Sequence, residues 1–490
     1  MTEATKGSSD VTSSERVLPA QPIPDLAGYR AVGGGRGLDA ARRLGPAATV
    51  DEIEASGLRG RGGAGFPTGV KWRTVAGNAS GTAAATVVVN GAEGEPGTFK
   101  DRAILRRNPW AVLEGALVAA LAVGADRAVV AVKESFTDEI DRLRAAIAEV
   151  VADGWCDGVE LTVATGPGEY LFGEETALLE VLDGRPPFPR LAPPFRHGVD
   201  EVGRDPGEPG GTTMARPGAG GAAPTLVDNV ETLANVPGIL AEGPAWFRTV
   251  GTPESPGTVV CTITGATARS GVAEVAMGTP LQAVIDDVGG GARRGRRLVA
   301  AMSGVANPLV PAEHFGTPLT YEHMQAIGSG LGAAGFVVFD DATDLAAVAA
   351  GVSRFLAVES CGQCTPCKQD GLAIADHLAR ITRSEGNDYD LAGVADRVAT
   401  VADEARCFLA TQHQVVIDSV LRLFPDSLRG HVAGTVPARD VALIAPLLGL
   451  DEGRAEVDVA RAAKQPDWTF DEVDSGKSPV ERLAEGGDAD

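Results

Sequence analysis

The chain has few cysteines, fewer basic than acidic residues and no long apolar run. Six unevenly spaced cysteines in 490 residues are too few for a disulfide framework. The net charge of −23, from 43 basic and 66 acidic residues, argues against nucleic acid and an anionic membrane surface as partners. The longest apolar stretch, near residues 116–125, is too short to span a bilayer, and residues 1–26 lack the apolar core of a secretory signal. We therefore expect a cytoplasmic protein in a reducing compartment, with no direct membrane insertion.

The first part of the chain alternates strands with helices. TVVVN (86–90), RAVVAVK (127–133) and VELTVAT (159–165) have the composition of buried strands, and helical segments follow each of them. This alternation predicts parallel strands joined by crossover helices, an α/β architecture. The length suggests about three domains, and we place the α/β domain at residues 51–245, after a polar N-terminal extension at residues 1–50.

The pattern changes twice beyond this domain. Strand segments at hairpin spacing, with one helix, predict a small β-grasp (ubiquitin-like) domain at residues 246–340. Residues 341–450 have helical patterns throughout and predict a four-helix bundle with cysteines at two of its junctions. The tail at residues 451–490 is polar and acidic, and we expect it to be disordered.

Three of the cysteines lie close together in the segment ESCGQCTPCKQD. Cys361, Cys364 and Cys367 follow C-x2-C-x2-C spacing, which wraps one loop around a common centre. A fourth ligand has to come from elsewhere, and Cys407 lies at the junction of two predicted helices that can return it to the triplet by packing antiparallel. Four such cysteines suit a [4Fe–4S] cluster, whose negative charge is favoured by the N-terminus of the following helix.

Two other kinds of site use the same residue type. Structural zinc also takes four thiolates, but usually as two separated C-x2-C pairs. A single C-x-x-C is compatible with redox dithiol chemistry. Cys156 and Cys261 lie apart from the group in sequence and fit ordinary buried positions.

A glycine-rich loop, GLRGRGGAGFPTGVKW (57–72), contains the pattern G-x-G-x-x-G. The dinucleotide fingerprint with this pattern needs a strand directly before it, whereas here a predicted helix precedes the loop and the first strand follows it. The glycines still allow backbone N–H groups to approach a phosphate or a flat ring, and Arg59, Arg61 and Lys71 add positive charge. A flexible surface loop is the alternative.

Two further loops follow predicted strands: NGAEGEPGTFKDR (90–102) and the segment at residues 168–175. Ligand loops of an α/β domain lie at the carboxyl ends of its parallel strands. Asn90, Glu93 and Glu95 offer acceptors for ribityl or ribose hydroxyls, although the first loop could equally cap the next helix. Two such loops at one edge of a sheet favour a binding site.

These segments together resemble one protein family. GLRGRGGAGFPTGVKW, EGEPGTFKDR, GEETALLE, DNVETLANV, YEHMQAIGSGLG and ESCGQCTPCKQD occur in the order found in the flavin-bearing F-type (51-kDa) subunit of respiratory complex I. The same module recurs in NAD-linked hydrogenases and formate dehydrogenases. The similarity covers about residues 50–425 and implies a Rossmann-like flavin domain, a ubiquitin-like domain and a helical bundle holding one [4Fe–4S] cluster.

The resemblance implies an NADH dehydrogenase (diaphorase) subunit, peripheral to the inner face of a membrane through its partners. In such a protein NADH gives a hydride to FMN, and single electrons pass to the cluster and on to partner subunits, among them a [2Fe–2S] thioredoxin-like subunit. By motif, the implied FMN contacts are Gly60, Arg61, Gly62, Lys71, Asn90, Glu93, Tyr170, Gly173, Glu174, Glu175 and Asn229. The implied NADH contacts are Gly63, Phe66, Glu95, Glu175 and Phe195, with Glu95 and Glu175 taken as catalytic, and the cluster ligands are Cys361, Cys364, Cys367 and Cys407.

Several positions depart from the family pattern. Ala92 replaces an aspartate expected to hold flavin hydroxyls, and Ala192 replaces a lysine. Arg73 and Thr74 stand where a second aromatic residue is common, and Asp228 replaces the first of two asparagines. These changes leave two alternatives open: a diverged flavin and iron–sulfur paralogue with a donor other than NADH, and a non-catalytic scaffold.

Overall fold

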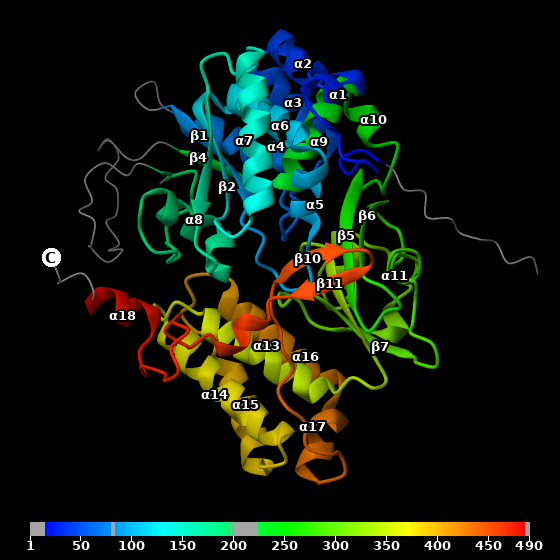
Figure 1. Cartoon of the computed structure of the whole chain (residues 1–490), viewed down its shortest axis with the longest axis vertical. Helices are drawn as coiled ribbons and strands as arrows, with labels where there is room; N and C mark the ends of the chain where they lie inside the picture. Colours follow the sequence, from blue (N-terminus) through cyan, green and yellow to red (C-terminus); the bar gives the residue numbers. More distant parts are fainter. Residues whose placement is uncertain (1–14, 80–83, 197, 200–223, 486–490) are drawn as a thin grey trace, which may run out of the picture.

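The structure is a computed structural model that describes residues 15–79, 84–196, 198–199 and 224–485. Three regions are visible in Figure 1: a four-stranded sheet with its helices, a five-stranded sheet, and a group of helices at the opposite end of the molecule from the four-stranded sheet. None of the described helices is both long and apolar enough to cross a membrane.

The four-stranded sheet is entirely parallel. Its strands are β1 (Ala85–Gly91), β2 (Ala125–Lys133), β3 (Glu160–Gly166) and β4 (Thr225–Asn229), in the order β3-β2-β1-β4. The first three strands are confirmed as predicted. The sequence analysis missed β4, because this strand is short and its last residue, Asn229, is also the N-cap of the next helix.

Both faces of this sheet are buried at the central strands β1 and β2, which explains their apolar runs without alternation, whereas the edge strand β3 is partly exposed. Val87 and Val89 of β1 contribute to the larger core, whereas Val88 contributes to a smaller one on the other face. The associated helices are α4 (Thr68–Asn78), α5 (Lys100–Arg107), α6 (Pro109–Val123), α7 (Thr137–Ala152), α8 (Glu175–Leu182), α9 (Val230–Glu242) and α10 (Pro244–Phe247), with a 3₁₀ turn at Tyr170–Gly173. Helices α6, α7 and α9 pack on the larger core and α8 on the smaller.

The N-terminal region is part of the same core. It forms α1 (Leu26–Ala31), α2 (Arg36–Leu44) and α3 (Pro46–Ser56), and Val17, Leu18 and Leu38 are buried against α/β core residues. The buried carboxylate of Glu114 on α6 accepts hydrogen bonds from Tyr29 Oη (2.7 Å) and from the Gly35 and Leu38 amides. The expectation of a separate polar extension is therefore wrong for residues 15–50, and residues 1–14 lie outside the described range.

The second sheet has five strands in the order β6-β5-β9-β7-β8. They are β5 (Thr258–Gly265), β6 (Gly271–Ala276), β7 (Leu298–Ser303), β8 (Val310–Pro311) and β9 (Gly335–Asp340). Strands β5 and β9 are parallel and the other pairs are antiparallel, so the predicted β5–β6 hairpin is confirmed. Helix α11 (Leu281–Gly289) packs on β5 and β6, and α12 (Tyr321–Ala326) follows a 3₁₀ turn at Ala312–His314.

The third region is helical. It contains α13 (Leu345–Glu359), α14 (Thr365–Thr382), α15 (Asp388–Thr400), α16 (Leu409–Leu423) and α17 (Pro425–Val432). Helix α13 contacts α14 and α16, and α15 packs against α14 and α16, around one shared apolar core. The cysteine triplet lies between α13 and α14, and Cys407 lies just before α16.

The tail is ordered over most of its length, which contradicts the expectation of disorder for residues 451–485. It forms the hairpin β10 (Leu447–Asp451) and β11 (Arg454–Val457), a 3₁₀ turn at Val459–Ala463, and α18 (Pro479–Glu485). Two side chains explain the order despite the polar composition. Trp468 is buried and donates from Nε1 to the Val358 carbonyl (2.9 Å), and Lys464 is buried in an ion pair with Glu359.

One close helix–helix approach should be sensitive to a single methyl group. A Cβ at Gly115 of α6 would lie 2.0 Å from the Leu233 carbonyl oxygen of α9. We expect Gly115→Ala to lower the free energy of unfolding by about 1–3 kcal/mol through overpacking, measured by urea denaturation.

Gly77 of α4 is the matched control for this prediction, because within the described part of the chain no atom lies within 4 Å of the position of its missing Cβ. Gly77→Ala should leave stability unchanged or raise it by about 0.5–1 kcal/mol, since alanine is the better helix former. Equal losses in the two variants would show that packing between α6 and α9 is not the cause.

Candidate functional site

The carboxyl ends of the parallel strands form the edge at which ligand loops are expected. Asn90 near the end of β1 donates from Nδ2 to the Gly173 carbonyl (2.9 Å), which ties β1 to the loop before α8. Asn229 at the end of β4 caps α9 by accepting from the Glu231 amide (3.0 Å). The structure therefore brings Asn90, Gly173 and Asn229 together at one edge, as the sequence analysis expected of the two loops.

The glycine loop lies between α3 and α4 and crosses this edge. A Cβ at Gly62 would lie 3.1 Å from the Asn229 Cβ, so the loop backbone is pressed against the end of β4. Gly60 donates its amide to the Phe66 carbonyl (2.8 Å), which closes the loop. By contrast, no atom of the described residues lies within 4 Å of a Cβ built at Gly63, and the Phe66 side chain is 55% exposed. One side of the loop is thus anchored and the other is open.

Arg61 does not project from the loop. Its guanidinium is buried and donates to the carbonyls of Thr258 (2.9 Å), Arg59 (2.8 Å) and Pro256 (3.1 Å). Its amide donates to the Thr232 hydroxyl (2.8 Å). In this structure the Arg61 side chain therefore joins the glycine loop to the start of β5 and does not face the open side.

Lys71 on α4 reaches the sheet edge. Its Nζ lies 2.6 Å from Glu175 Oε1, 3.9 Å from Asp228 Oδ1, and also donates to the Val227 carbonyl. Burial alone would lower the pKa of Lys71, but Glu175 and Asp228 raise it, so Lys71 stays protonated within this group of carboxylates. Asp228 accepts from Trp72 Nε1 (2.7 Å), and burial raises its pKa to about 6.

The two glutamates of the first loop have different surroundings. The Glu93 carboxylate is engaged within the protein, because it accepts hydrogen bonds from the amides of Asp101 and Arg102 and from Arg102 Nε (3.1 Å). Glu95 is partly buried, and its carboxylate accepts from Tyr170 Oη and from the Val305 amide (2.5 Å), with no cation in contact with it in the described part of the chain. Burial raises the pKa of Glu95 to about 7.

The remaining predicted residues lie beside this edge. Glu174 caps α8 by accepting from the amides of Thr176 (3.0 Å) and Ala177 (2.8 Å), so its carboxylate is a helix cap. Phe195 is half-buried against the larger core. The loop that follows it lies mostly in residues 200–223, outside the described range.

The sequence analysis missed a buried ion network behind the edge. Lys100 Nζ contacts Asp101 (2.8 Å), Asn229 Oδ1 (2.9 Å) and Glu231 (2.9 Å). The signal was present in FKDR (99–102), where charged residues open a helix directly after a ligand loop. Lys133 was also missed: it ends the apolar run of β2, is buried, and donates to the Gly168 carbonyl (3.0 Å).

The cysteine triplet is shaped by the start of α14. The helix begins at Thr365, and Pro366 fits its first turn. Cys364 is therefore the N-cap residue, and Cys367 lies within the first turn. Arg406 returns beside the triplet and donates its amide to Cys364 Sγ (3.4 Å), which brings the adjacent Cys407 to the same place.

The four cysteines lie within electrostatic reach of one another. Burial, with smaller contributions from the neighbouring Cys361 and Cys364, raises the pKa of Cys367 to about 11. Burial also raises the pKa of Cys407, with smaller contributions from Glu174, Cys361 and Cys367. Buried thiols gathered in this way fit a cationic centre that binds them as thiolates.

The donor set fits a cluster better than a single ion. Among the described residues, no three His, Cys, Asp or Glu side chains are arranged to hold one metal ion. Four thiolates of a [4Fe–4S] cluster each bind a different iron, so they surround a volume and need not converge on a point. Polar groups also approach the sulfurs: Gln363 Nε2 lies 3.5 Å from Cys361 Sγ and Ser360 Oγ lies 3.2 Å from Cys367 Sγ.

Comparisons with known proteins match both halves of the chain. Residues 53–238 match the Nuo51 FMN-binding domain, and residues 347–431 match the NADH-ubiquinone oxidoreductase-F iron–sulfur binding region. The F 2 subunit of the NADH-quinone oxidoreductase of Rhizobium meliloti is 35% identical over 426 residues, which cover 84% of this chain and 96% of that protein. The F-type subunit of the same enzyme in Mycobacterium tuberculosis is 34% identical over 412 residues, which cover 82% of this chain and 88% of that protein.

A solved structure is also similar. The NAD+-reducing [NiFe]-hydrogenase in its H2-reduced state contains a chain that is 31% identical, with a TM-score of 0.71. The match covers 84% of this chain and 67% of that chain.

The raised pKa of Glu95 predicts a pH-dependent stability. Between the ordinary value of 4.5 and about 7 the folded protein holds a proton that the unfolded chain releases, so stability falls as pH rises through this window. Glu95→Gln keeps the contact with Tyr170 but has no carboxyl group to titrate. In this variant the decrease in the free energy of unfolding between pH 4.5 and about 7 should be smaller by about 3 kcal/mol, measured by urea denaturation at several pH values. The control Glu472→Gln changes an exposed carboxylate and should leave the profile as it is. Parallel profiles for wild type and Glu95→Gln would contradict the assignment.

Proposed function

The chain belongs to the family of F-type subunits of NADH-quinone oxidoreductase, and we propose that its sheet-edge residues hold FMN and NADH while its four cysteines hold the cluster. It is an electron-transfer subunit of the NADH dehydrogenase type, with an FMN-binding domain and a [4Fe–4S] region. The observation that carries the residue assignment is the position of Tyr170. Its hydroxyl contacts Glu95 on the nucleotide side, and its amide donates to Glu359, two residues before Cys361.

When bound, FMN supplies hydride acceptance from NADH and one-electron release to the cluster. The residues proposed to hold it supply complementary groups. Lys71 gives a fixed positive charge, Asn90 and Asn229 give amide groups at the ends of β1 and β4, and the Gly60–Gly62 backbone allows close approach. Glu175, the ion-pair partner of Lys71, lies at the start of α8. Arg61, Glu93 and Glu174 enter the proposal as residues that hold loops, because their side chains are engaged within the protein.

NADH is proposed to enter over the open side of the glycine loop. Gly63 leaves free space there, and the exposed ring of Phe66 offers a stacking surface, with Phe195 as a second candidate. Glu95, with its raised pKa, can hold or release a proton near neutral pH beside Tyr170. This proton is held on the Glu95 carboxyl within a partly buried contact.

Two departures from the family pattern concern the proposed contacts: the missing second aromatic residue concerns NADH, and Ala92 concerns the flavin hydroxyls. Arg73 is turned away, because it pairs with Asp51 (2.8 Å) and Glu54 (2.6 Å) on α3. Ala92 is buried and offers no carboxylate. A missing stacking ring costs about 1 kcal/mol and a missing charged hydrogen bond about 1.5–3 kcal/mol. We therefore propose that this chain binds its nucleotide more weakly than family members that carry both groups.

The finer organisation is part of the same proposal. The five-stranded sheet corresponds to the β-grasp (ubiquitin-like) unit, and α13–α16 correspond to the four-helix bundle. The relatives are subunits of NADH-quinone oxidoreductases and one neighbour is a hydrogenase, so this chain passes electrons to partner subunits. A [2Fe–2S] thioredoxin-like subunit is the proposed first neighbour, in a cytoplasmic assembly at the inner face of a membrane.

Two cations on one helix allow a matched test of the flavin site. Lys71→Met removes the positive charge at the sheet edge and should weaken FMN binding roughly ten- to a hundredfold, the equivalent of one charged hydrogen bond. Arg73→Met, two residues away, removes a cation whose ion-pair partners among the described residues lie on α3, and it should leave FMN binding unchanged. Flavin content of the assembled complex, measured by fluorescence after extraction, checks both. Equal flavin loss in the two variants would contradict the proposed role of Lys71.

The cluster assignment is tested by Cys364→Ser. This variant should lose the cluster's iron and its electron paramagnetic resonance signal, while NADH still bleaches the flavin. Cys156→Ser is the control, because Cys156 lies against the α/β core, far along the chain from the triplet. A full iron signal in Cys364→Ser would overturn the ligand assignment. A wild-type complex that binds flavin but is not reduced by NADH would overturn the choice of donor.

A further inference from the structure

The C-terminal segment (residues 447–485) lies outside both matched regions, which end at residues 238 and 431. Its hairpin β10–β11 lies between the sheets and the helices, and the chain then runs along the helices to α18 (Figure 1). It contains a buried lysine, Lys464, which is 1% exposed. Burying a cation costs free energy unless an anion pairs with it. The partner of Lys464 therefore shows which part of the molecule the segment is joined to.

That partner is Glu359, the last residue of α13. Lys464 Nζ lies 2.8 Å from Glu359 Oε1 and 2.9 Å from Oε2, and Arg461 Nη1 lies 3.3 Å from Oε1. The amide of Tyr170 donates to the same carboxylate (2.9 Å). Arg461 also donates from Nη2 to the Gly168 carbonyl (2.7 Å). Glu359 therefore joins the loop that follows β3 to the helix that leads into the cysteine triplet.

The same segment also contacts the loop that carries the cysteines. Lys368 Nζ donates to the Pro466 carbonyl (2.5 Å), and the Val480 amide donates to the Cys361 carbonyl (3.2 Å). A Cβ at Gly362 would lie 2.4 Å from the Ser478 Cβ. The segment is thus packed directly on the cysteine loop.

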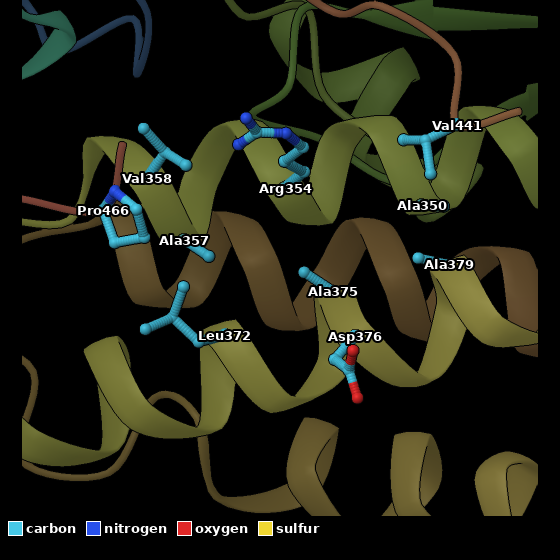
Figure 2. A pocket seen from close by; sticks show the side chains of 10 residues that line it. All are labelled: Ala350, Arg354, Ala357, Val358, Leu372, Ala375, Asp376, Ala379, Val441 and Pro466. Carbon is cyan, nitrogen blue, oxygen red and sulfur yellow. The ribbon is translucent and has the colours of Figure 1, made fainter. Parts of the chain in front are cut away.

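Helix α13 holds the segment in place along its length. Arg354 donates from Nη2 to the carbonyls of Ala462 (2.8 Å) and Lys464 (3.2 Å). Figure 2 shows Pro466 at one end of a cavity of about 200 Å³ between α13 and α14, beside Ala357 and Val358. Arg354 of α13 therefore fixes the backbone around Lys464, and the Lys464 side chain points to Glu359.

We propose that Lys464 is a positioning residue of the electron path: through Glu359 it fixes the flavin-side loop at Tyr170 relative to the cysteine loop at Cys361. The proposal rests on the proposed function for the identity of the two redox centres. Electron transfer depends steeply on the distance between centres, so a link that holds both loops controls that distance. The Lys464 charge also offsets the charge of Glu359 beside the cysteines, and its loss makes the surroundings more negative and reduction of the cluster harder.

The test combines a charge change with its repair in the assembled complex. Lys464→Met should lower the midpoint potential of the cluster, measured by redox titration with electron paramagnetic resonance. Lys464→Arg should retain the wild-type potential, and Lys464→Met with Glu359→Gln should restore it, because that pair is again neutral overall. Lys477→Met is the matched control, since Lys477 belongs to the same segment but pairs with Glu485 at the surface.

A second readout does not depend on any cofactor. Hydrogen exchange of the Tyr170 amide should become roughly tenfold faster in Lys464→Met, as expected when a hydrogen-bond acceptor loses its fixed position. Unchanged exchange at Tyr170, with or without iron in the variant, overturns the proposal. An unchanged midpoint potential in an iron-replete variant does the same. A wild-type complex without flavin or cluster would instead overturn the proposed function, and the exchange experiment would still decide whether Lys464 holds the loop.

Discussion

The arrangement of this molecule depends on buried charges that are paired across segments far apart in sequence. Lys100 pairs with Glu231 behind the sheet edge, and Lys464 pairs with Glu359 between the flavin-side loop and the cysteine loop. Removing one member of such a pair leaves an uncompensated charge, which destabilises a protein by about 3–5 kcal/mol. Each pair therefore fixes the relative position of two segments more strictly than apolar packing does, because a small displacement separates the charges.

The sequence was sufficient to predict most of the helices and strands, but not the contacts between segments that lie far apart in the chain. The strands β1, β2 and β3, the β5–β6 hairpin and the helices α13–α16 were predicted from apolar periodicity, a local property. Strand β4 was missed because pairing with β1, and not its own five residues, makes it a strand. The order of the tail was missed because composition does not show that Trp468 and Lys464 find partners on α13.

The candidate site was predictable to different extents in its two halves. The spacing of Cys361, Cys364 and Cys367 restricts the chemistry directly, and the family resemblance supplied the nucleotide residues. Which of those residues face a ligand was not visible in the motif: Arg61 is turned into the protein, whereas Gly63 beside it is open. The direction of the Arg61 side chain depends on partners such as Thr258, which lies about two hundred positions away. A local sequence motif contains no information about such partners.

The C-terminal segment connects distant parts of the sequence to the cysteines. Ser478 packs on Gly362 and the Val480 amide donates to the Cys361 carbonyl, although both residues lie far from the cysteine loop in the sequence. A substitution in this segment can therefore alter the surroundings of the cysteines without changing any cysteine. The local environment of the four thiols is thus determined by residues outside the motif that contains three of them.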